Sequence, residues 1–411
     1  MTSLDDHLAL PSRDAPDART GRMPSAARLL VALLGGLRHG ALHLRLPDGT
    51  TRRFGRGGDE PPAVLAMRDW RVAADTLKGG DVGFAEAYMR GGWDTPDLPR
   101  LLTVLAANQA ALERAFFGRG LAAWLARLRH LLRANTRRQA KRNIVAHYDL
   151  GNDFYRLWLD PSMTYSSALY GGEARSLHDA QQAKYRRILA MLALPPGAHV
   201  LEIGCGWGGF AEVAARAGHR VTGLSLSDAQ TAYARERLAR AGLAAQVDFR
   251  VQDYRDERGR YDGVVSIEMI EAVGERWWPA YFAKVRDALR PGGRACIQAI
   301  TIDGAKFERY RRETDFIQQY VFPGGMLPSP ARLHEEARGA GLACEDVRTF
   351  GDDYERTLRA WLDAFDARAD TVRAQGFDER FVRCWRFYLA YCIAGFATRS
   401  TDVGHYTFVC P

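Results

Sequence analysis

The segment HVLEIGCGWGGF, residues His199–Phe210, decides how the rest of the chain is interpreted. A short apolar run comes first and predicts a buried strand, and Gly204 and Gly206 then allow a tight turn into a helix. A glycine turn of this kind brings a ligand close to the backbone, beside the positive end of the helix. The turn therefore predicts a cofactor site, and the alternative is a tight strand-to-helix connection that binds nothing.

Strands and helices alternate on the C-terminal side of this segment. Apolar runs predict the further strands Arg220–Leu226, Val247–Gln252, Tyr261–Ile267, Arg294–Thr301 and His405–Val409. Helical periodicity predicts the helices Phe210–Ala217, Asp228–Ala241, Pro279–Leu289, Glu355–Arg373 and Glu379–Ala397. This alternation predicts an α/β fold with a doubly wound, Rossmann-like parallel sheet.

Two features distinguish the glycine turn from a dinucleotide site. A dinucleotide site has an acidic residue at the end of the second strand, where it holds a ribose, but that strand ends here in Leu224–Ser227, without a carboxylate. Glu202 lies instead inside the first strand, just before the glycines, and LEIGCGWG thereby resembles the first motif of class I SAM-dependent methyltransferases. Tyr254, after the third strand, would then offer a stacking face to adenine, or it packs as an ordinary strand-end residue.

The chain has 411 residues, enough for two or three domains. Residues 1–25 are polar and rich in Pro and Arg, so we expect a disordered tail. Residues 26–115 predict a small α+β domain, in which Ala41–Phe54 forms a hairpin. Residues 116–150 are expected to form a basic amphipathic helix and linker, and residues 151–411 the methyltransferase catalytic domain.

The stretch Arg119–Arg142 is rich in Lys and Arg, contains no acidic residue, and carries Leu residues and Trp124 at helical spacing. Such a helix is typical of a membrane-surface or nucleic-acid element, or it is an interdomain helix whose charges are simply solvated. The net charge of +8 favours an anionic partner without choosing between these alternatives.

Other sequence features narrow the class of protein. No stretch approaches the ~18 apolar residues that span a bilayer, and the N-terminus lacks the apolar core of a signal peptide. We therefore expect a cytoplasmic protein that contacts the inner face of the membrane only peripherally. The six cysteines form neither a CxxC pair nor a zinc-like cluster, so we expect reduced thiols and no metal.

Several motifs occur in a fixed order along residues 140–411. They are HYDLGNDFYRLWLDPSMTYSSALY (His147–Tyr170), LEIGCGWGG (Leu201–Gly209), GLSLSDAQ (Gly223–Gln230), SIEMIEAVG (Ser266–Gly274), DFIQQYVFPGGMLPS (Asp315–Ser329) and FGDDYERTLRAW (Phe350–Trp361). With these motifs the chain resembles the cyclopropane-fatty-acyl-phospholipid synthases and the related mycolic acid cyclopropane synthases. The N-terminal residues resemble the small domain that bacterial members add before the catalytic core.

The resemblance implies a cofactor, SAM, and a set of residues that hold it. Tyr165 and Ser166 would contact its amino-acid end, and Gly204 and Gly206 would pass under the methionine moiety. The residues implied near the ribose are Ser225, Leu226 and Gln230.

The resemblance also implies a bound bicarbonate ion beside the transferring methyl group. The family holds it with a Cys, a Glu, a His and a Tyr, and the matching catalytic candidates here are Ser167, Glu271, Gln298 and Tyr354. Ser and Gln can still donate hydrogen bonds to an anion, but Gln cannot act as a base. Proton removal is therefore left to bicarbonate, to Glu271 or Glu268 directly, or to a group elsewhere.

Glu271 is the leading candidate for a catalytic carboxylate. It follows the fourth predicted strand, at the edge of the sheet where α/β proteins bind ligands. The alternative is an ordinary carboxylate at the N-terminus of a helix.

The expected function is methyl or methylene transfer from SAM to the double bond of unsaturated acyl chains in membrane phospholipids, with cyclopropane formation. The alternatives are methylation without ring closure, which gives a methylene or methyl branch, a SAM methyltransferase for a soluble metabolite, and a non-catalytic binding protein. The sequence contains no nucleic-acid motif, and the resemblance suggests that the N-terminal domain pairs subunits in a homodimer.

Overall fold

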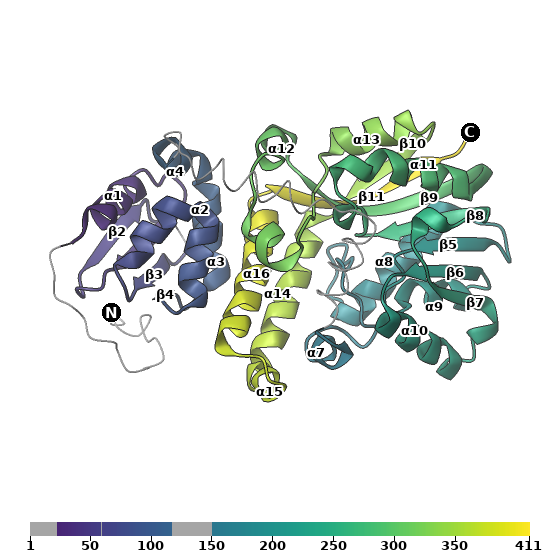
Figure 1. The fold of residues 1–411 in the computed structure, drawn as a ribbon, viewed down its shortest axis with the longest axis horizontal. Coiled ribbons are helices and arrows are strands. Elements are labelled where there is room, and N and C mark those ends of the chain that lie inside the picture. The colour runs from purple at the N-terminus through teal and green to yellow at the C-terminus, as the bar shows by residue number, and fades with distance from the viewer. Residues whose placement is uncertain (1–22, 59, 117–149) are drawn as a thin grey trace. The chain divides into compact units, whose positions relative to one another are not determined.

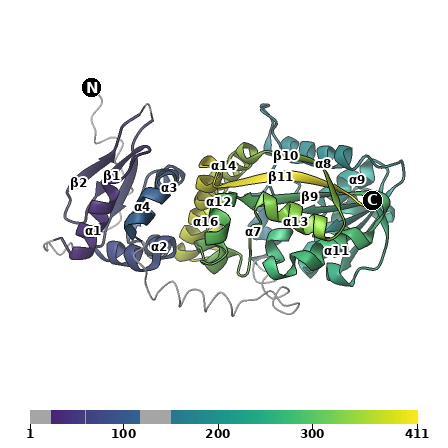
Figure 2. The same cartoon turned by 90° about the horizontal axis from the view of Figure 1, so that it is seen from above.

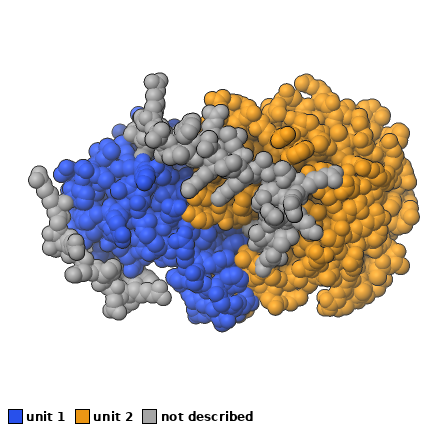
Figure 3. Space-filling model, in the orientation of Figure 1, with its two compact units in different colours: residues 1–128, 369–398 blue, residues 129–368, 399–411 orange. Residues whose placement is uncertain are grey.

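The structure of the protein is a computed structural model that describes residues 23–58, 60–116 and 150–411. Nearly all of the predicted tail and of the predicted basic helix therefore lies outside the described residues, as do His147 and its neighbours in the first family motif. The chain forms two compact units, one of residues 1–128 with 369–398 and one of residues 129–368 with 399–411 (Figure 3).

The smaller unit contains a four-stranded sheet with the order β2-β1-β3-β4. Its strands are β1 (Ala41–Arg45), β2 (Thr51–Gly55), β3 (Ala63–Met67) and β4 (Trp93–Asp94). The antiparallel pairing of β1 with β2 confirms the predicted hairpin. The helices of the N-terminal segment are α1 (Ser25–Leu34), α2 (Arg71–Met89), α3 (Leu98–Ala107) and α4 (Gln109–Phe116).

Helices α15 (Ala369–Ala374) and α16 (Glu379–Ala397) belong to this smaller unit, although the sequence placed them in the catalytic domain. Helix α16 packs against α2 and α3. Arg383 shows the physical reason, because its guanidinium donates to the carbonyls of Tyr88 and Trp93 and to the carboxylate of Asp94. An apolar helix face predicts that a helix is packed, but it does not identify the partner.

The larger unit contains a seven-stranded sheet with the order β10-β11-β9-β8-β5-β6-β7 (Figure 1). Its strands are β5 (His199–Ile203), β6 (Arg220–Ser225), β7 (Val247–Val251), β8 (Tyr261–Ile267), β9 (Leu289–Ile302), β10 (Ala343–Thr349) and β11 (Thr401–Val409). The strands from β7 to β9 are parallel, which confirms the predicted doubly wound α/β sheet. The sheet differs from the prediction at one edge, where β11 runs antiparallel between β9 and β10.

Helices cover both faces of this sheet (Figure 2). One face carries α8 (Leu177–Leu192), α9 (Gly209–Arg216) and α10 (Asp228–Arg240), whose apolar side chains form one core with the sheet. The other face carries α11 (Trp278–Ala288) and α13 (Pro330–Gly339) over a second core. The chain moves outward from β5 in both directions, so the carboxyl ends of β5 and β8 form the point at which α/β sheets bind ligands.

Several elements differ from the predicted ones. The helix expected over Glu355–Arg373 ends at Ala367 as α14 (Gly351–Ala367), and a separate α15 follows it. The additional elements are α7 (Asn152–Arg156), α8, α12 (Gly304–Tyr310), the π-helix η5 (Ile317–Val321), α13 and β10. Among the described helices, none combines the length and the apolar character that crossing a bilayer requires.

Candidate active site

A pocket lies at the carboxyl ends of β5, β6 and β8 in the larger unit. The glycine turn after β5 forms its floor, and the segment before α8, the start of α10 and the end of β7 contribute its walls. Every residue that the sequence predicted for SAM lines this pocket, namely Tyr165, Ser166, Gly204, Gly206, Ser225, Leu226, Gln230 and Tyr254. The fold therefore brings the whole predicted cofactor set together.

The glycine turn leaves space for a ligand on its pocket side. Gly204 has a φ of 85° and Gly206 a φ of 49°, which are left-handed conformations that favour glycine. A Cβ at Gly206 would have no heavy atom within 4 Å, so this part of the backbone faces open space. The turn is held from below, because the amides of Gly204 and Cys205 both donate to the carbonyl of Leu224. A ligand can therefore lie directly on the backbone at Gly206.

Glu202 provides an independent indication that a ligand belongs in this pocket. Its side chain is buried in the pocket wall, and its Oε2 has no hydrogen-bond partner. Buried polar atoms are normally hydrogen-bonded, so an acceptor in this position fits a ligand that brings its own donor. The ammonium group of SAM is such a donor. Burial also raises the pKa of Glu202 well above its usual range, as expected for a carboxyl group without a partner.

Tyr254 lies at the wall of the pocket and also packs against a neighbouring aromatic ring. It lines the pocket and its ring also meets the edge of Tyr281, at 5.8 Å between centroids. The neighbouring Asp253 forms an ion pair with Arg255 at 2.5 Å. This side of the pocket, where the sequence predicts adenine, is therefore an aromatic face beside an ion pair.

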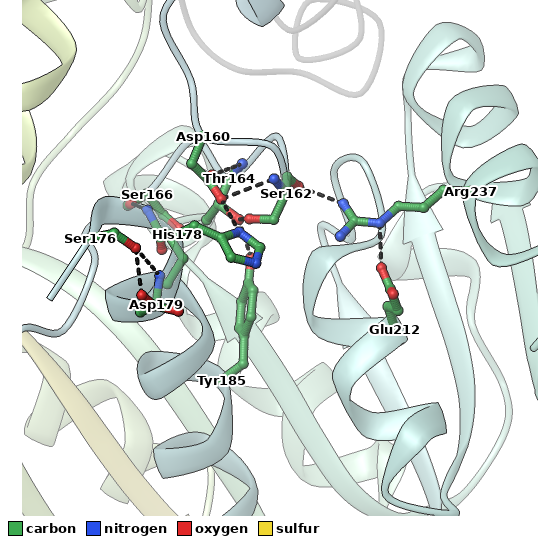
Figure 4. Close-up of polar contacts among 11 residues, drawn as sticks. Asp160, Ser162, Thr164, Ser166, Ser176, His178, Asp179, Tyr185, Glu212 and Arg237 are labelled. Carbon is green, nitrogen blue, oxygen red and sulfur yellow. Dashed lines mark hydrogen bonds and ion pairs between the residues drawn. The ribbon is translucent and has the colours of Figure 1, made fainter. Parts of the chain in front are cut away.

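The segment before α8 is tied down by hydrogen bonds to helices on the same face of the sheet (Figure 4). Asp160 accepts from the amide of Thr164 and contacts Nδ1 of His178 at 2.9 Å. The hydroxyl of Thr164 lies 2.9 Å from that of Tyr185 on α8, and Arg237 of α10 donates to the backbone of the same segment. These contacts hold Tyr165 and Ser166, which follow directly in the chain, at the pocket.

The carboxylate of Glu268 lies in the pocket wall and accepts three hydrogen bonds. Its Oε1 accepts from the amide of Ser167 at 2.9 Å and from Nε2 of Gln298 at 2.7 Å, and its Oε2 accepts from the hydroxyl of Tyr354 at 2.7 Å. The pKa of Glu268 is raised above its usual value, because burial outweighs the opposing effect of these donors and of Lys184. The backbone of Glu268 has a φ of 48°, a strained conformation for a residue with a side chain, and such strain is concentrated at functional sites.

A histidine on the neighbouring strand orients Gln298. His405 of β11 lies opposite Gln298 of β9, and its Nε2 contacts Oε1 of Gln298 at 2.9 Å. Burial lowers the pKa of His405 well below its usual range, so the ring is neutral and can donate one proton from Nε2. With Oε1 of the amide occupied in this way, the NH₂ group of Gln298 faces Glu268.

Glu271 is not among the residues that line this pocket. Its Oε1 accepts from the amide of Ile300 at 2.6 Å, and its Oε2 is buried without a partner. Burial and the neighbouring charge of Glu268 raise the pKa of Glu271 to about 8. Two carboxyl groups with environments this different separate into an ionised and a neutral member. Glu271, with its pKa of about 8, is protonated at neutral pH, whereas three hydrogen-bond donors and Lys184 oppose the rise in the pKa of Glu268.

The four catalytic candidates from the sequence are therefore not arranged around Glu271. Ser167, Gln298 and Tyr354 contact Glu268, which the sequence analysis offered only as an alternative base. His405 was not predicted to take part, and its cross-strand pairing with Gln298 could not be read before the order of the strands was known. Lys184 was also missed, and a cation on the apolar face of α8 is the signal that could have identified it.

The doubly wound sheet, the glycine turn and the partnerless acceptor of Glu202 together define a class I SAM-dependent methyltransferase. Comparison with known proteins agrees. The family model described as mycolic acid cyclopropane synthetase matches residues 135–406, and the chain belongs to this family. SAM is accordingly its cofactor.

Individual relatives extend over most of the chain. The tuberculostearic acid methyltransferase UfaA1 of Mycobacterium tuberculosis is 39% identical over 408 residues, which is 95% of this chain and 94% of that protein. The cyclopropane-fatty-acyl-phospholipid synthase of Escherichia coli is 35% identical over 349 residues, 84% of this chain and 88% of that protein. The crystal structure of the mycolic acid cyclopropane synthase CmaA1 with SAH and CTAB superimposes with a TM-score of 0.62 at 30% identity, covering 66% of this chain and 98% of that one.

Proposed function

We propose that this enzyme transfers the methyl group of SAM to the double bond of an unsaturated acyl chain in a membrane phospholipid, and that Glu268 removes the proton that completes the reaction. We further propose that the product carries a branch and that no ring closes. The observation that carries the proposal is the carboxylate of Glu268, in the wall of the cofactor pocket, with three hydrogen-bond donors converging on it.

The geometry of this cluster supports Glu268 as the base. A general base must lie beside the reacting atoms and must be ionised before it acts. Glu268 meets the first condition through its place in the pocket wall, and its three donors stabilise the ionised form. Glu271 meets neither condition at neutral pH, because it lies outside the pocket lining and its pKa is raised to about 8.

The residues do not fit a separate bicarbonate ion. The family resemblance implies that Ser167, Gln298 and Tyr354 would hold such an ion. The amide of Ser167, Nε2 of Gln298 and the hydroxyl of Tyr354 donate to Glu268 instead, and the hydroxyl of Ser167 donates to the carbonyl of Ala168. A second anion at this point would be repelled by that carboxylate. No step of the proposed reaction therefore passes through bicarbonate.

When bound, SAM supplies an electrophilic methyl group. The glycine turn and the wall around Ser225 and Tyr254 hold the cofactor, and the chemistry requires an acyl double bond within about 3–3.5 Å of the methyl carbon. Bound SAM would supply this methyl group to the π electrons of the alkene, with the electron pair of the broken S–C bond left on sulfur and a carbocation left on the acyl chain. A hydride shift moves the charge to the methyl-bearing carbon. Glu268 then accepts a proton from the new methyl group, which leaves a methylene branch.

The preference for a branched product rests on the step at which the routes diverge. Ring closure and branching share the methyl transfer and differ in how the cation loses its proton. The groups that act at that step differ from those that the resemblance implies for ring formation. Gln298 and Ser167 occupy two positions of the implied anion site, and both donate to the carboxylate of Glu268. The name of the relative UfaA1, a methyltransferase that matches along almost the whole chain, supports the same product class.

A membrane lipid is the substrate class that the relatives' names support. The net charge of +8 would favour docking to anionic vesicles. Peripheral association with the membrane and pairing of subunits stay predictions. Co-sedimentation with anionic vesicles tests the first, and light scattering of the purified protein tests the second.

The test uses purified full-length protein, SAM carrying a ¹³C-labelled methyl group, and vesicles of dioleoyl phosphatidylglycerol. We expect acyl chains that are heavier by one labelled CH₂ group, with vinylidene protons in the NMR spectrum and an unchanged rate when bicarbonate is removed. Absence of label from the lipid would overturn the proposal. Cyclopropane protons would overturn its product, and a requirement for bicarbonate would overturn the assignment of the base.

A further inference from the structure

Lys184 is a buried cation that the proposed reaction has not used. Its side chain is 0% exposed on the apolar face of α8, and among the described residues it is the only Lys or Arg buried to this degree. A buried ammonium group costs free energy unless anions compensate its charge. Because burying this charge destabilises the fold, we looked for a role of the charge in the site.

The surroundings of Lys184 connect it to Glu268. Its Nζ donates to Oγ of Ser166 at 2.7 Å, and Gln181, one turn earlier on α8, donates to the carbonyl of Ser166 at 2.9 Å. The next residue, Ser167, donates its amide to Glu268. The ammonium group of Lys184 is therefore hydrogen-bonded to Ser166, and the carboxylate of Glu268 is hydrogen-bonded to the adjacent residue, Ser167.

Other charged groups also face Lys184, and the hydrogen bonds through Ser166 and Ser167 connect it to Glu268. Three carboxyl groups favour its positive charge, those of Glu268 after β8, Asp160 and Glu202. Asp160 already has its own partners in His178 and the backbone of the segment before α8. The remaining neighbours are His405 on β11, which is neutral, and the ring of Tyr185 at 4.5 Å.

We propose that Lys184 is a positioning residue whose buried charge keeps Glu268 ionised and thereby ready to accept a proton. This inference rests on the proposed function of Glu268, and it adds that the base depends on a cation from a different element of the fold. Burial alone would favour a protonated Glu268, and a protonated carboxyl group cannot act as the base. Burial lowers the pKa of Lys184 to about 7, and Glu268 opposes that shift, so the two groups support each other's charge.

The experiment measures the ionisation of Glu268 directly. Protein labelled with ¹³C-carboxyl glutamate is titrated by infrared spectroscopy, and the band of Glu268 is identified by its loss in Glu268→Gln. In Lys184→Met and in Lys184→Gln we expect the midpoint of this band to rise by about one pH unit or more, because an opposite charge nearby lowers a carboxyl pKa by about that amount. Lys184→Gln can keep a hydrogen bond to Ser166, so it separates the charge from the contact. Lys184→Arg is expected to restore a midpoint near that of the wild type.

Lys284→Met is the matched control. Lys284 donates to the carbonyl of Glu257 and its removal deletes one charge elsewhere in the same unit, so the Glu268 band should not move. The acid limb of the methyl-transfer rate should shift with the infrared midpoint, which a purely structural role for Lys184 would not produce. An unchanged midpoint in both neutral variants would overturn the proposal.

The infrared midpoint needs no lipid and no turnover. If it shifts while no methyl group reaches the lipid, the proposed function fails and the pairing of Lys184 with Glu268 stands. If methyl transfer proceeds while the midpoint stays constant, the pairing fails and the proposed function stands.

Discussion

The cofactor side of the pocket and the side that accepts the proton differ in how the chain forms them. On the cofactor side, the turn at Gly204 and Gly206 is backbone that follows β5 within one local stretch of chain. The proton-accepting side is made of side chains, and the contact between Tyr354 and Glu268 joins residues 86 positions apart. Backbone conformation is set locally and tolerates changes nearby, whereas converging side chains depend on one another. Changes on the cofactor side should therefore alter binding, and changes on the other side should alter turnover.

Glu268→Gln is the strongest test of this division. An amide cannot accept the proton, so we expect the rate of methyl transfer to lipid to fall about 10³-fold, within the range that general bases contribute. The dissociation constant for SAM, measured by calorimetry, should stay within about threefold of the wild type. Glu236→Gln, which alters an exposed ion pair with Arg240, is the control and should keep the wild-type rate. A rate within tenfold of wild type in Glu268→Gln would remove Glu268 from the reaction.

Tyr354→Phe should give the next largest effect. The variant removes one donor from the Glu268 carboxylate, and a hydrogen bond to a charged group is worth about 1.5–3 kcal/mol, or roughly 10- to 100-fold in rate. The loss should be greatest at low pH, because the lost donor had lowered the pKa of Glu268. Tyr391→Phe is a matched control, since its hydroxyl donates to Asp81 in the smaller unit. A loss that is equal at all pH values would contradict this explanation.

The same division explains how much the sequence could predict. The strand and the glycine turn were predicted correctly, and the predicted cofactor residues line one pocket, because their signals lie in short segments with a fixed geometry. The choice between Glu268 and Glu271 could not be made, because the two residues lie three positions apart and only the fold decides which one faces Gln298 and Tyr354. The sequence placed α16 in the catalytic domain, whereas the structure groups it with the smaller unit, since an apolar face does not identify its partner.

Gly206→Ala tests the cofactor side. An alanine at a φ of 49° costs about 1–2 kcal/mol of backbone strain, and its methyl group would project into the space for SAM. We expect SAM to bind about tenfold more weakly, with no change in the pH profile of the rate at saturating SAM. Gly218→Ala is the matched control, because Gly218 also has a positive φ and an open Cβ position but does not line the pocket. Gly218→Ala should lose a similar amount of thermal stability and keep its affinity for SAM. If both variants bind SAM equally weakly, backbone strain alone explains the loss.

Glu271→Gln should have the smallest effect on rate and a distinct effect on stability. The amide mimics the protonated carboxyl group, so we expect a loss of about fivefold at most, the value of one hydrogen bond between neutral groups. The pKa of Glu271 is about 8 in the folded protein against an ordinary 4.5, so its protonated form favours folding fully below pH 4.5. That contribution declines by up to about 1.4 kcal/mol per pH unit as the pH rises toward 8. The variant should lack this decline, and its melting temperature should therefore fall less than that of the wild type between pH 6 and 9. If the melting temperatures of the two proteins fall equally between pH 6 and 9, Glu271 is ionised at neutral pH. Glu268 and Glu271 would then not differ in charge, and charge could not explain why only one of them acts as the base.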